Sequence, residues 1–121
     1  MNLVPLALIF AATAALGQAT PTEFPEGANT FSADALTSAV ASKVFTVNPA
    51  KGPNWRWQFN PNGYFFINVG NFAESGKWST KDSTLCTESR QFKYSCSEVR
   101  AHGPDLYLKR ESGEVIRMTL Q

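Results

Sequence analysis

The sequence has few of the side chains that most metal and catalytic sites need. It contains one histidine and two cysteines in 121 residues, which is too few cysteines for an all-cysteine zinc site. Neither charge is in excess, since eleven basic and ten acidic residues give a net charge of +1. Proteins that bind nucleic acids or anionic membranes normally carry a clear basic excess, so we expect neither partner. Aromatic residues make up 12% of the chain, which indicates a folded domain rather than a disordered one.

Known catalytic motifs are also absent from the sequence. His102 lies among Ala101, Gly103 and Pro104, a composition typical of a turn, so we expect a solvated loop residue. There is no Gly-x-Ser-x-Gly nucleophile motif and no glycine-rich phosphate loop. The acidic residues are expected at turns and on polar strand faces, where they solvate the surface. We therefore expect no enzymatic activity, no bound metal and no cofactor.

The beginning of the chain has the composition of a secretory signal peptide. Residues 3–16 form an uncharged apolar run, and Gly17-Gln18-Ala19 fits the small-x-small pattern before a cleavage site. The run is short for a hydrocarbon core about 30 Å thick, which argues against a membrane-anchoring helix. We expect residues 1–19 to be removed after Ala19, with no stable membrane insertion afterwards. The expected location is the periplasm or the cell exterior.

The two cysteines predict a structural disulfide. Cys86 and Cys96 are ten residues apart, a spacing that fits neither a redox Cys-x-x-Cys pair nor a zinc finger. In an oxidising compartment two such thiols usually form a bond. An antiparallel turn centred on Gln91 would place Cys86 directly opposite Cys96.

The remaining chain is predicted to be mainly β. Residues 20–31 contain two prolines and no periodicity, so they are expected to form a flexible N-terminal lead before a single domain at 32–121. A short helix is predicted over residues 32–41, with Ser32 or Asp34 as its cap. Seven or eight short strands follow at regular spacing with turn signals between them. This α+β pattern indicates an antiparallel meander, either a sheet curled over the helix or a small barrel.

Two hairpins are specified in detail by their alternation and turn residues. The segment Asn60–Gly63 is a proline-glycine turn between two alternating strands, and it pairs Phe59 with Phe65 and Trp57 with Ile67. The C-terminal hairpin around Glu111-Ser112-Gly113 likewise has a glycine-containing turn between two alternating strands. Its register pairs Leu108 with Ile116 and Leu106 with Met118, and brings Arg110 opposite Glu114.

The order of these features resembles a bacterial family. A short helix, an aromatic strand ending at Asn62-Gly63, then Gly76-Lys77-Trp78, Leu85-Cys86, Cys96 and a final hairpin are similar to uncharacterised small exported bacterial domains with a lipocalin-like β meander. In lipocalin-type barrels the Gly-x-Trp element lies on the first strand, whereas here it is in mid-chain. The resemblance covers about residues 32–121 and implies a small periplasmic domain, with no catalytic residues to carry over.

The aromatic residues are predicted to divide between two faces of the meander. The core set is Trp55, Trp57, Phe59, Phe65 and Trp78. A candidate binding surface lies on the opposite face, formed by Arg56, Tyr64, Phe66, Tyr107 and Arg117. Tyrosine and arginine are enriched at binding hot spots, so these residues are candidates for a recognition surface or a barrel mouth. The alternative is a partly covered second face that packs on the helix.

Two functional hypotheses follow from the sequence. The first is a non-enzymatic exported domain that binds a small apolar or anionic ligand, or a protein partner. The alternative is a periplasmic inhibitor or immunity-type protein that blocks a secreted hydrolase. An internal cavity of several hundred Å³ would favour a small ligand. A filled core with a protruding loop, at residues 48–54 or 101–105, would favour inhibition.

Overall fold

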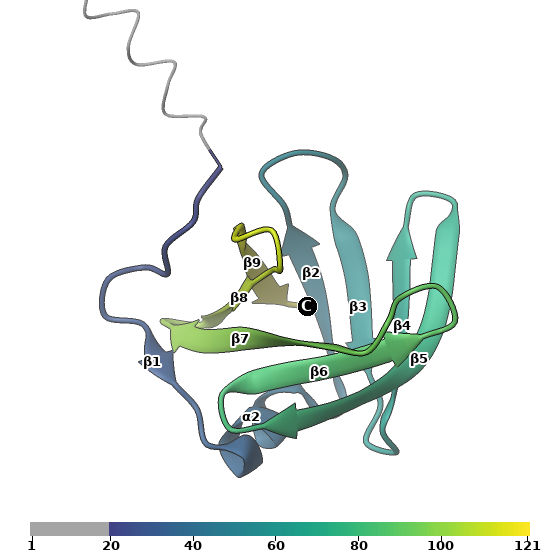
Figure 1. Ribbon diagram of the computed structural model, residues 1–121, viewed down its shortest axis with the longest axis horizontal. Coiled ribbons are helices and arrows are strands. Elements are labelled where there is room, and N and C mark those ends of the chain that lie inside the picture. The colour runs from purple at the N-terminus through teal and green to yellow at the C-terminus, as the bar shows by residue number, and fades with distance from the viewer. Residues whose placement is uncertain (1–19) are drawn as a thin grey trace, which may run out of the picture.

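The computed structural model describes residues 20–121, so the expected signal peptide lies outside the described residues. Within them the main feature is a closed antiparallel barrel of eight strands in chain order (Figure 1). The barrel closes because its last strand, Val115–Leu120, pairs with its first strand, Lys43–Asn48. The strands are β2 (Lys43–Asn48), β3 (Trp55–Phe59), β4 (Tyr64–Val69), β5 (Phe72–Lys81), β6 (Thr84–Ser89), β7 (Ser95–His102), β8 (Asp105–Lys109) and β9 (Val115–Leu120). The predicted mainly β fold is confirmed, as a small barrel.

Both predicted hairpins have the expected register. Phe59 pairs with Phe65 and Trp57 with Ile67 across β3 and β4, and Leu108 pairs with Ile116 across β8 and β9. Because side chains alternate between the two faces of a strand, one set from each strand fills the barrel. The buried interior includes Phe45, Val47, Trp57, Phe59, Phe65, Ile67, Trp78, Leu85, Val99, Leu106, Leu108, Ile116 and Met118.

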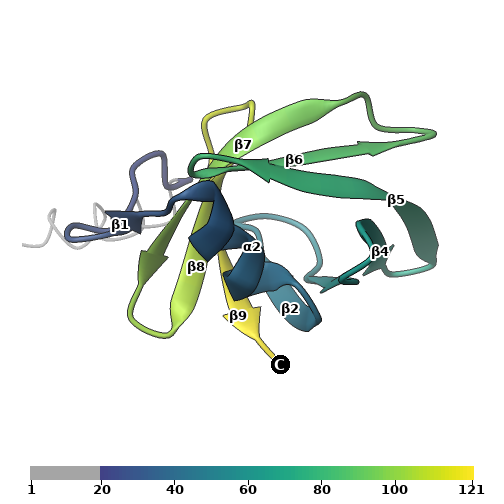
Figure 2. The same ribbon diagram turned by 90° about the horizontal axis from the view of Figure 1, so that it is seen from below.

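A single helix closes one end of the barrel. Helix α2 (Ala33–Val40) begins at Ser32, whose side chain accepts a hydrogen bond from the Ala35 backbone N–H at 3.1 Å. Leu36 and Val40 are fully buried against the barrel interior, and Figure 2 shows the helix lying across the barrel end. Tyr64 and Phe66 on the outer face are each 46% exposed, and the buried helix residues belong to the core inside the barrel. The alternative in which the outer sheet face packs on the helix is therefore wrong.

The Gly-x-Trp element joins β5 to the first hairpin. The indole Nε1 of Trp78 donates to the carbonyl of Asn60 at 2.9 Å, and the Trp78 backbone N–H donates to the carbonyl of Gly63 at 2.9 Å. At Gly76 a Cβ atom would overlap the Phe65 ring and the Glu88 carbonyl. Glycine at this position therefore lets the Phe65 ring lie against the backbone of β5, while the tryptophan fixes the turn.

The segment before the helix lies against the outside of the barrel. Strand β1 (Asn29–Thr30) pairs with β7, and the Val115 backbone N–H donates to the carbonyl of Pro21 at 2.9 Å. The Phe24 ring lies 4.4 Å from the Arg100 guanidinium carbon. Residues 20–31, expected to be a flexible lead, thus make specific contacts with the barrel, while their mobility stays a prediction. No helix among residues 20–121 has the length and apolarity needed to cross a membrane.

The predicted disulfide is confirmed. Cys86 on β6 and Cys96 on β7 are bonded and directly opposite each other in the register. Their neighbours in the two strands, Leu85 with Ser97 and Thr87 with Ser95, point to the other face of the sheet. The bond therefore lies on the outer side of the barrel wall.

Candidate functional site: a cavity inside the barrel

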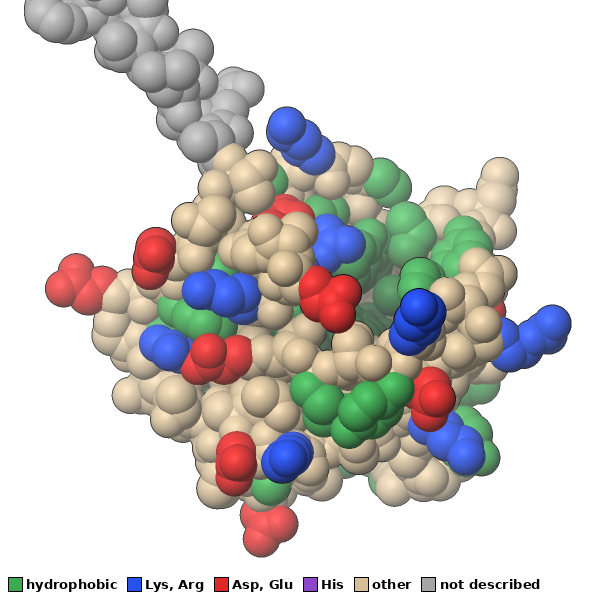
Figure 3. Space-filling view, in the orientation of Figure 1, with side chains coloured by type: hydrophobic (Ala, Val, Ile, Leu, Met, Phe, Trp, Pro, Cys, Tyr) green, Lys and Arg blue, Asp and Glu red, His purple; other side chains and the backbone are tan. Residues whose placement is uncertain are grey.

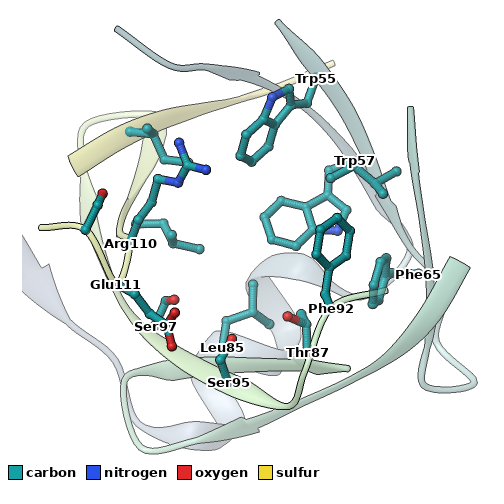
Figure 4. A pocket seen from close by; sticks show the side chains of 14 residues that line it. Trp55, Trp57, Phe65, Leu85, Thr87, Phe92, Ser95, Ser97, Arg110 and Glu111 are labelled. Carbon is teal, nitrogen blue, oxygen red and sulfur yellow. The ribbon is translucent and has the colours of Figure 1, made fainter. Parts of the chain in front are cut away.

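The barrel encloses a cavity of about 410 Å³ that is open at one end. Figure 4 looks into it from the mouth, with α2 beyond its floor, and the space-filling view shows hydrophobic side chains inside a hollow of the surface (Figure 3). The lining residues are Trp55, Trp57, Phe65, Ile67, Leu85, Thr87, Phe92, Ser95, Ser97, Leu108, Arg110, Glu111, Ser112 and Ile116. They come from strands β3, β4 and β6–β9 and from two loops, so the site is a property of the closed barrel.

One wall of the cavity is aromatic and apolar. Trp55 and Trp57 project from β3, and Phe65 and Ile67 project from β4. The rings of Trp57 and Phe65 meet edge to face with centroids 6.2 Å apart, and those of Trp55 and Trp57 do so at 6.3 Å. Such contacts hold the rings in fixed orientations, which gives the wall a defined shape.

The wall across from the tryptophans carries small hydroxyl side chains. Thr87 on β6 and Ser95 and Ser97 on β7 line the cavity (Figure 4). Leu85, directly opposite Ser97 in the register, adds an apolar patch at the same wall. Because serine and threonine are small, they leave empty the volume that a larger side chain would fill, and their hydroxyls can both donate and accept hydrogen bonds.

The charges at the mouth balance one another. The Arg110 guanidinium carbon lies 5.0 Å from the centre of the Trp55 ring, and its Nη1 lies 3.0 Å from Oε1 of Glu114. The other carboxylate oxygen of Glu114 accepts from the Ala50 backbone N–H at 2.9 Å. Glu111 is the second charged residue of the lining. Arg110 is thus fixed between an aromatic face and a carboxylate, which reduces its attraction for an anionic ligand.

The loop between β6 and β7 places an aromatic ring at the mouth. Phe92 lines the cavity and is 47% exposed. Its ring meets that of Phe72 edge to face at 6.1 Å. The Gln91 backbone N–H donates to the carboxylate of Glu74 at 3.1 Å, so β5 holds the loop by two contacts.

Trp57 has a buried hydrogen-bond donor that finds no partner in the part of the chain that the structure describes. Its Nε1 is covered, and no hydrogen-bond acceptor for it is found within residues 20–121. The same atom of Trp78 is bonded to the Asn60 carbonyl. A buried donor left unpaired costs free energy, so such groups are uncommon and call for an explanation.

The candidate binding surface predicted from the sequence is divided in two by the fold. Arg56 on β3 and Tyr64 and Phe66 on β4 are exposed on the outer face, where Arg56 Nη1 donates to the Gln58 side chain at 3.3 Å. Tyr107 and Arg117 pair with each other on β8 and β9. Strand β2 lies between the two groups, so the structure does not gather these five residues into one site.

Tyr107 and Arg117 do line a second, smaller cleft. It has a volume of about 240 Å³, and the segment at Pro21 to Pro25 forms its other side. Arg117 Nε lies 3.8 Å from the carboxylate of Asp105. None of the five predicted surface residues lines the larger cavity.

Sequence reasoning assigned Trp55, Trp57 and Phe65 to the core, and it missed that they also form a cavity wall. It missed Ser95, Ser97, Phe92 and Arg110 as well. One available signal was the pair of serines at alternate, inward positions of a predicted strand, since small polar residues at core positions leave space. Among residues 20–121 no group of histidine, cysteine, aspartate or glutamate side chains is arranged to hold a metal ion.

Comparisons with protein-family models, with curated proteins and with solved structures found no match for this chain.

Proposed function

We propose that the protein is an exported, small-molecule-binding module that holds its ligand inside the barrel. The observation that carries this proposal is the cavity of about 410 Å³ with one open end. Ligand pockets are typically about 300–1,000 Å³, mostly apolar, with a few placed polar groups. The aromatic wall, the hydroxyl wall and the single mouth arginine fit that description.

Export is supported by two independent features of the chain. Residues 1–19 have the pattern of a signal peptide, and the Cys86–Cys96 bond is of a kind that persists in oxidising compartments. We therefore propose that ligand binding takes place in the periplasm or outside the cell. The alternative of a hydrolase inhibitor is less favoured, because it called for a filled core with a protruding loop.

A fluorescent apolar dye, N-phenylnaphthylamine, tests the proposed function directly. We expect saturable fluorescence enhancement by the protein comprising residues 20–121. Ser97→Phe places an aromatic ring in the cavity and should weaken dye binding about tenfold or more, because it occupies the space and removes apolar contacts. Ser75→Phe is the matched control, since Ser75 is exposed opposite Phe66 on the outer face, and it should leave binding within about twofold.

A folded Ser97→Phe variant that binds the dye as well as the Ser75→Phe control would contradict binding inside the barrel. Absence of any saturable dye binding would contradict the proposed function altogether. Native mass spectrometry of protein purified from its own compartment is a separate measurement, because it would identify a retained ligand by its mass.

A further inference from the structure

The depth of the cavity contains hydrogen-bonding groups and no charge. Among residues 20–121 the charged residues that line the cavity are Arg110 and Glu111, which belong to the loop at the mouth, and Arg110 is already paired with Glu114. Below them the polar groups are the hydroxyls of Thr87, Ser95 and Ser97. Burying an unpaired ionised group costs far more than burying a neutral polar one. An ionised ligand group would find no partner there.

The Trp57 indole adds a single donor to the opposite, aromatic wall. Trp57 is only 7% exposed, lines the cavity, and keeps its Nε1–H without an acceptor among the described residues. Free energy is recovered if a bound molecule supplies that acceptor, because the unpaired donor is already buried before binding. The neighbouring rings of Trp55 and Phe65 favour a flat molecule that packs against them.

We propose that the ligand is a small, uncharged, planar molecule whose carbonyl or equivalent acceptor receives the Trp57 Nε1–H hydrogen bond. This inference rests on the proposed binding inside the barrel. The Nε1 atom is covered in the structure, so binding must shift a neighbouring side chain. Phe92 is one candidate for this shift, because its ring is half exposed and lies on a loop, and the shift would have to break its edge-to-face contact with Phe72. Phe92 and Trp57 both line the cavity (Figure 4).

Proton–nitrogen correlation spectra of the tryptophan side chains test the hydrogen bond. Coumarin is a suitable probe because it is neutral, planar and bicyclic and carries a carbonyl group. We expect saturating coumarin to move the Trp57 indole N–H proton downfield, as a new hydrogen bond does. The Trp78 indole N–H is the internal control, since it is already bonded to the Asn60 carbonyl and should move little. Trp57→Phe identifies the resonance.

Affinities measured by competition with the dye give a second test. Trp57→Phe keeps an aromatic ring and removes the donor. It should lower the affinity for coumarin about fivefold to tenfold more than the affinity for naphthalene, which has a similar shape and no acceptor. In the unaltered protein, naphthoate should compete at least about tenfold more weakly than coumarin, because its carboxylate is ionised.

Three results would overturn this inference while leaving binding inside the barrel intact. One is dye displacement by coumarin without a downfield shift of the Trp57 N–H. Another is an equal effect of Trp57→Phe on coumarin and naphthalene. The third is failure of coumarin to displace a dye that Ser97→Phe excludes. Loss of dye binding in the unaltered protein would instead remove the proposed function on which the inference rests.

Discussion

Two aromatic residues of the β3–β4 hairpin, one on each strand, face different environments. Trp57 is 7% exposed and packs among Phe59, Phe65 and Trp55, whereas Phe66 is 46% exposed on the outer face. Both residues are large and aromatic, so it is the alternation of side chains along each strand, together with the register between the strands, that places them on opposite faces. Trp57 belongs to the buried core and also lines the cavity, while Phe66 contacts solvent.

Alanine substitutions at these two positions should therefore differ in cost. Trp57→Ala should lower the free energy of unfolding by about 3–5 kcal/mol, because it removes a large buried ring and leaves a void. Phe66→Ala should cost no more than about 1–1.5 kcal/mol, because half of the side chain is already solvated. Denaturant melts of both variants measure the difference. Equal losses would mean that both faces of the hairpin are buried.

Dye binding by Phe66→Ala separates the cavity from the outer surface. The sequence alone placed Phe66 in a candidate binding surface, and on that interpretation its loss would weaken binding. Phe66 does not line the cavity, so the folded variant should retain dye binding if the proposed function is right. A clear loss of binding would favour the outer face of β3 and β4 as the site.

At the scale of elements, the β6–β7 hairpin combines stability with the binding site. Its outer side carries the Cys86–Cys96 bond, its inner side carries the hydroxyl wall, and its loop carries Phe92. The disulfide, the hydroxyl wall and Phe92 at the mouth therefore belong to one covalently closed hairpin. Breaking the Cys86–Cys96 bond should therefore loosen the hairpin that forms one wall of the cavity.

Reduction of the disulfide should destabilise the protein without unfolding it at room temperature. Closing a loop of about ten residues contributes a little under ~3 kcal/mol by the chain-entropy model, against about 5–10 kcal/mol in total for a domain of this size. The melting temperature should fall by roughly 10–20 °C on reduction, as thermal melts would record. The double variant Cys86→Ser with Cys96→Ser is the control and should not respond to reductant. Ready alkylation of both cysteines in native, unreduced protein would show that the bond is absent.

The elements differ in how far the sequence determines them. The hairpins were predictable because alternation and turn residues lie within a few positions of each other, as at Asn60–Gly63. The closure of the barrel between β2 and β9 was not, because strands far apart in the sequence leave no local signal. The cavity was missed for a different reason. Trp57 and Phe65 have the same pattern whether the space beside them is filled or empty, and only the small residues across the barrel decide it.

At the scale of the molecule, the two ends of the barrel differ: one is closed by a helix and the other is open. Helix α2 seals one end with Leu36 and Val40, and the hydroxyls of Thr37 and Thr80 are hydrogen-bonded at 2.7 Å. The other end is open to the cavity. A barrel sealed at one end and open at the other gives a small molecule one route in and out.

The segment before the barrel should begin at Thr20 in the exported protein. Gly17-Gln18-Ala19 meets the requirement for small residues at the first and third positions before the cut, and cleavage there keeps Pro21, whose carbonyl accepts the Val115 backbone N–H. Intact-mass analysis of the exported fraction measures the cleavage point. Ala19→Leu should block processing, whereas Gln18→Leu, between the two small positions, should be cut normally. Exported protein that still carries residues 1–19 would contradict this prediction. So would a cut beyond Pro21, because it would remove the contact that holds the start of the chain against β9.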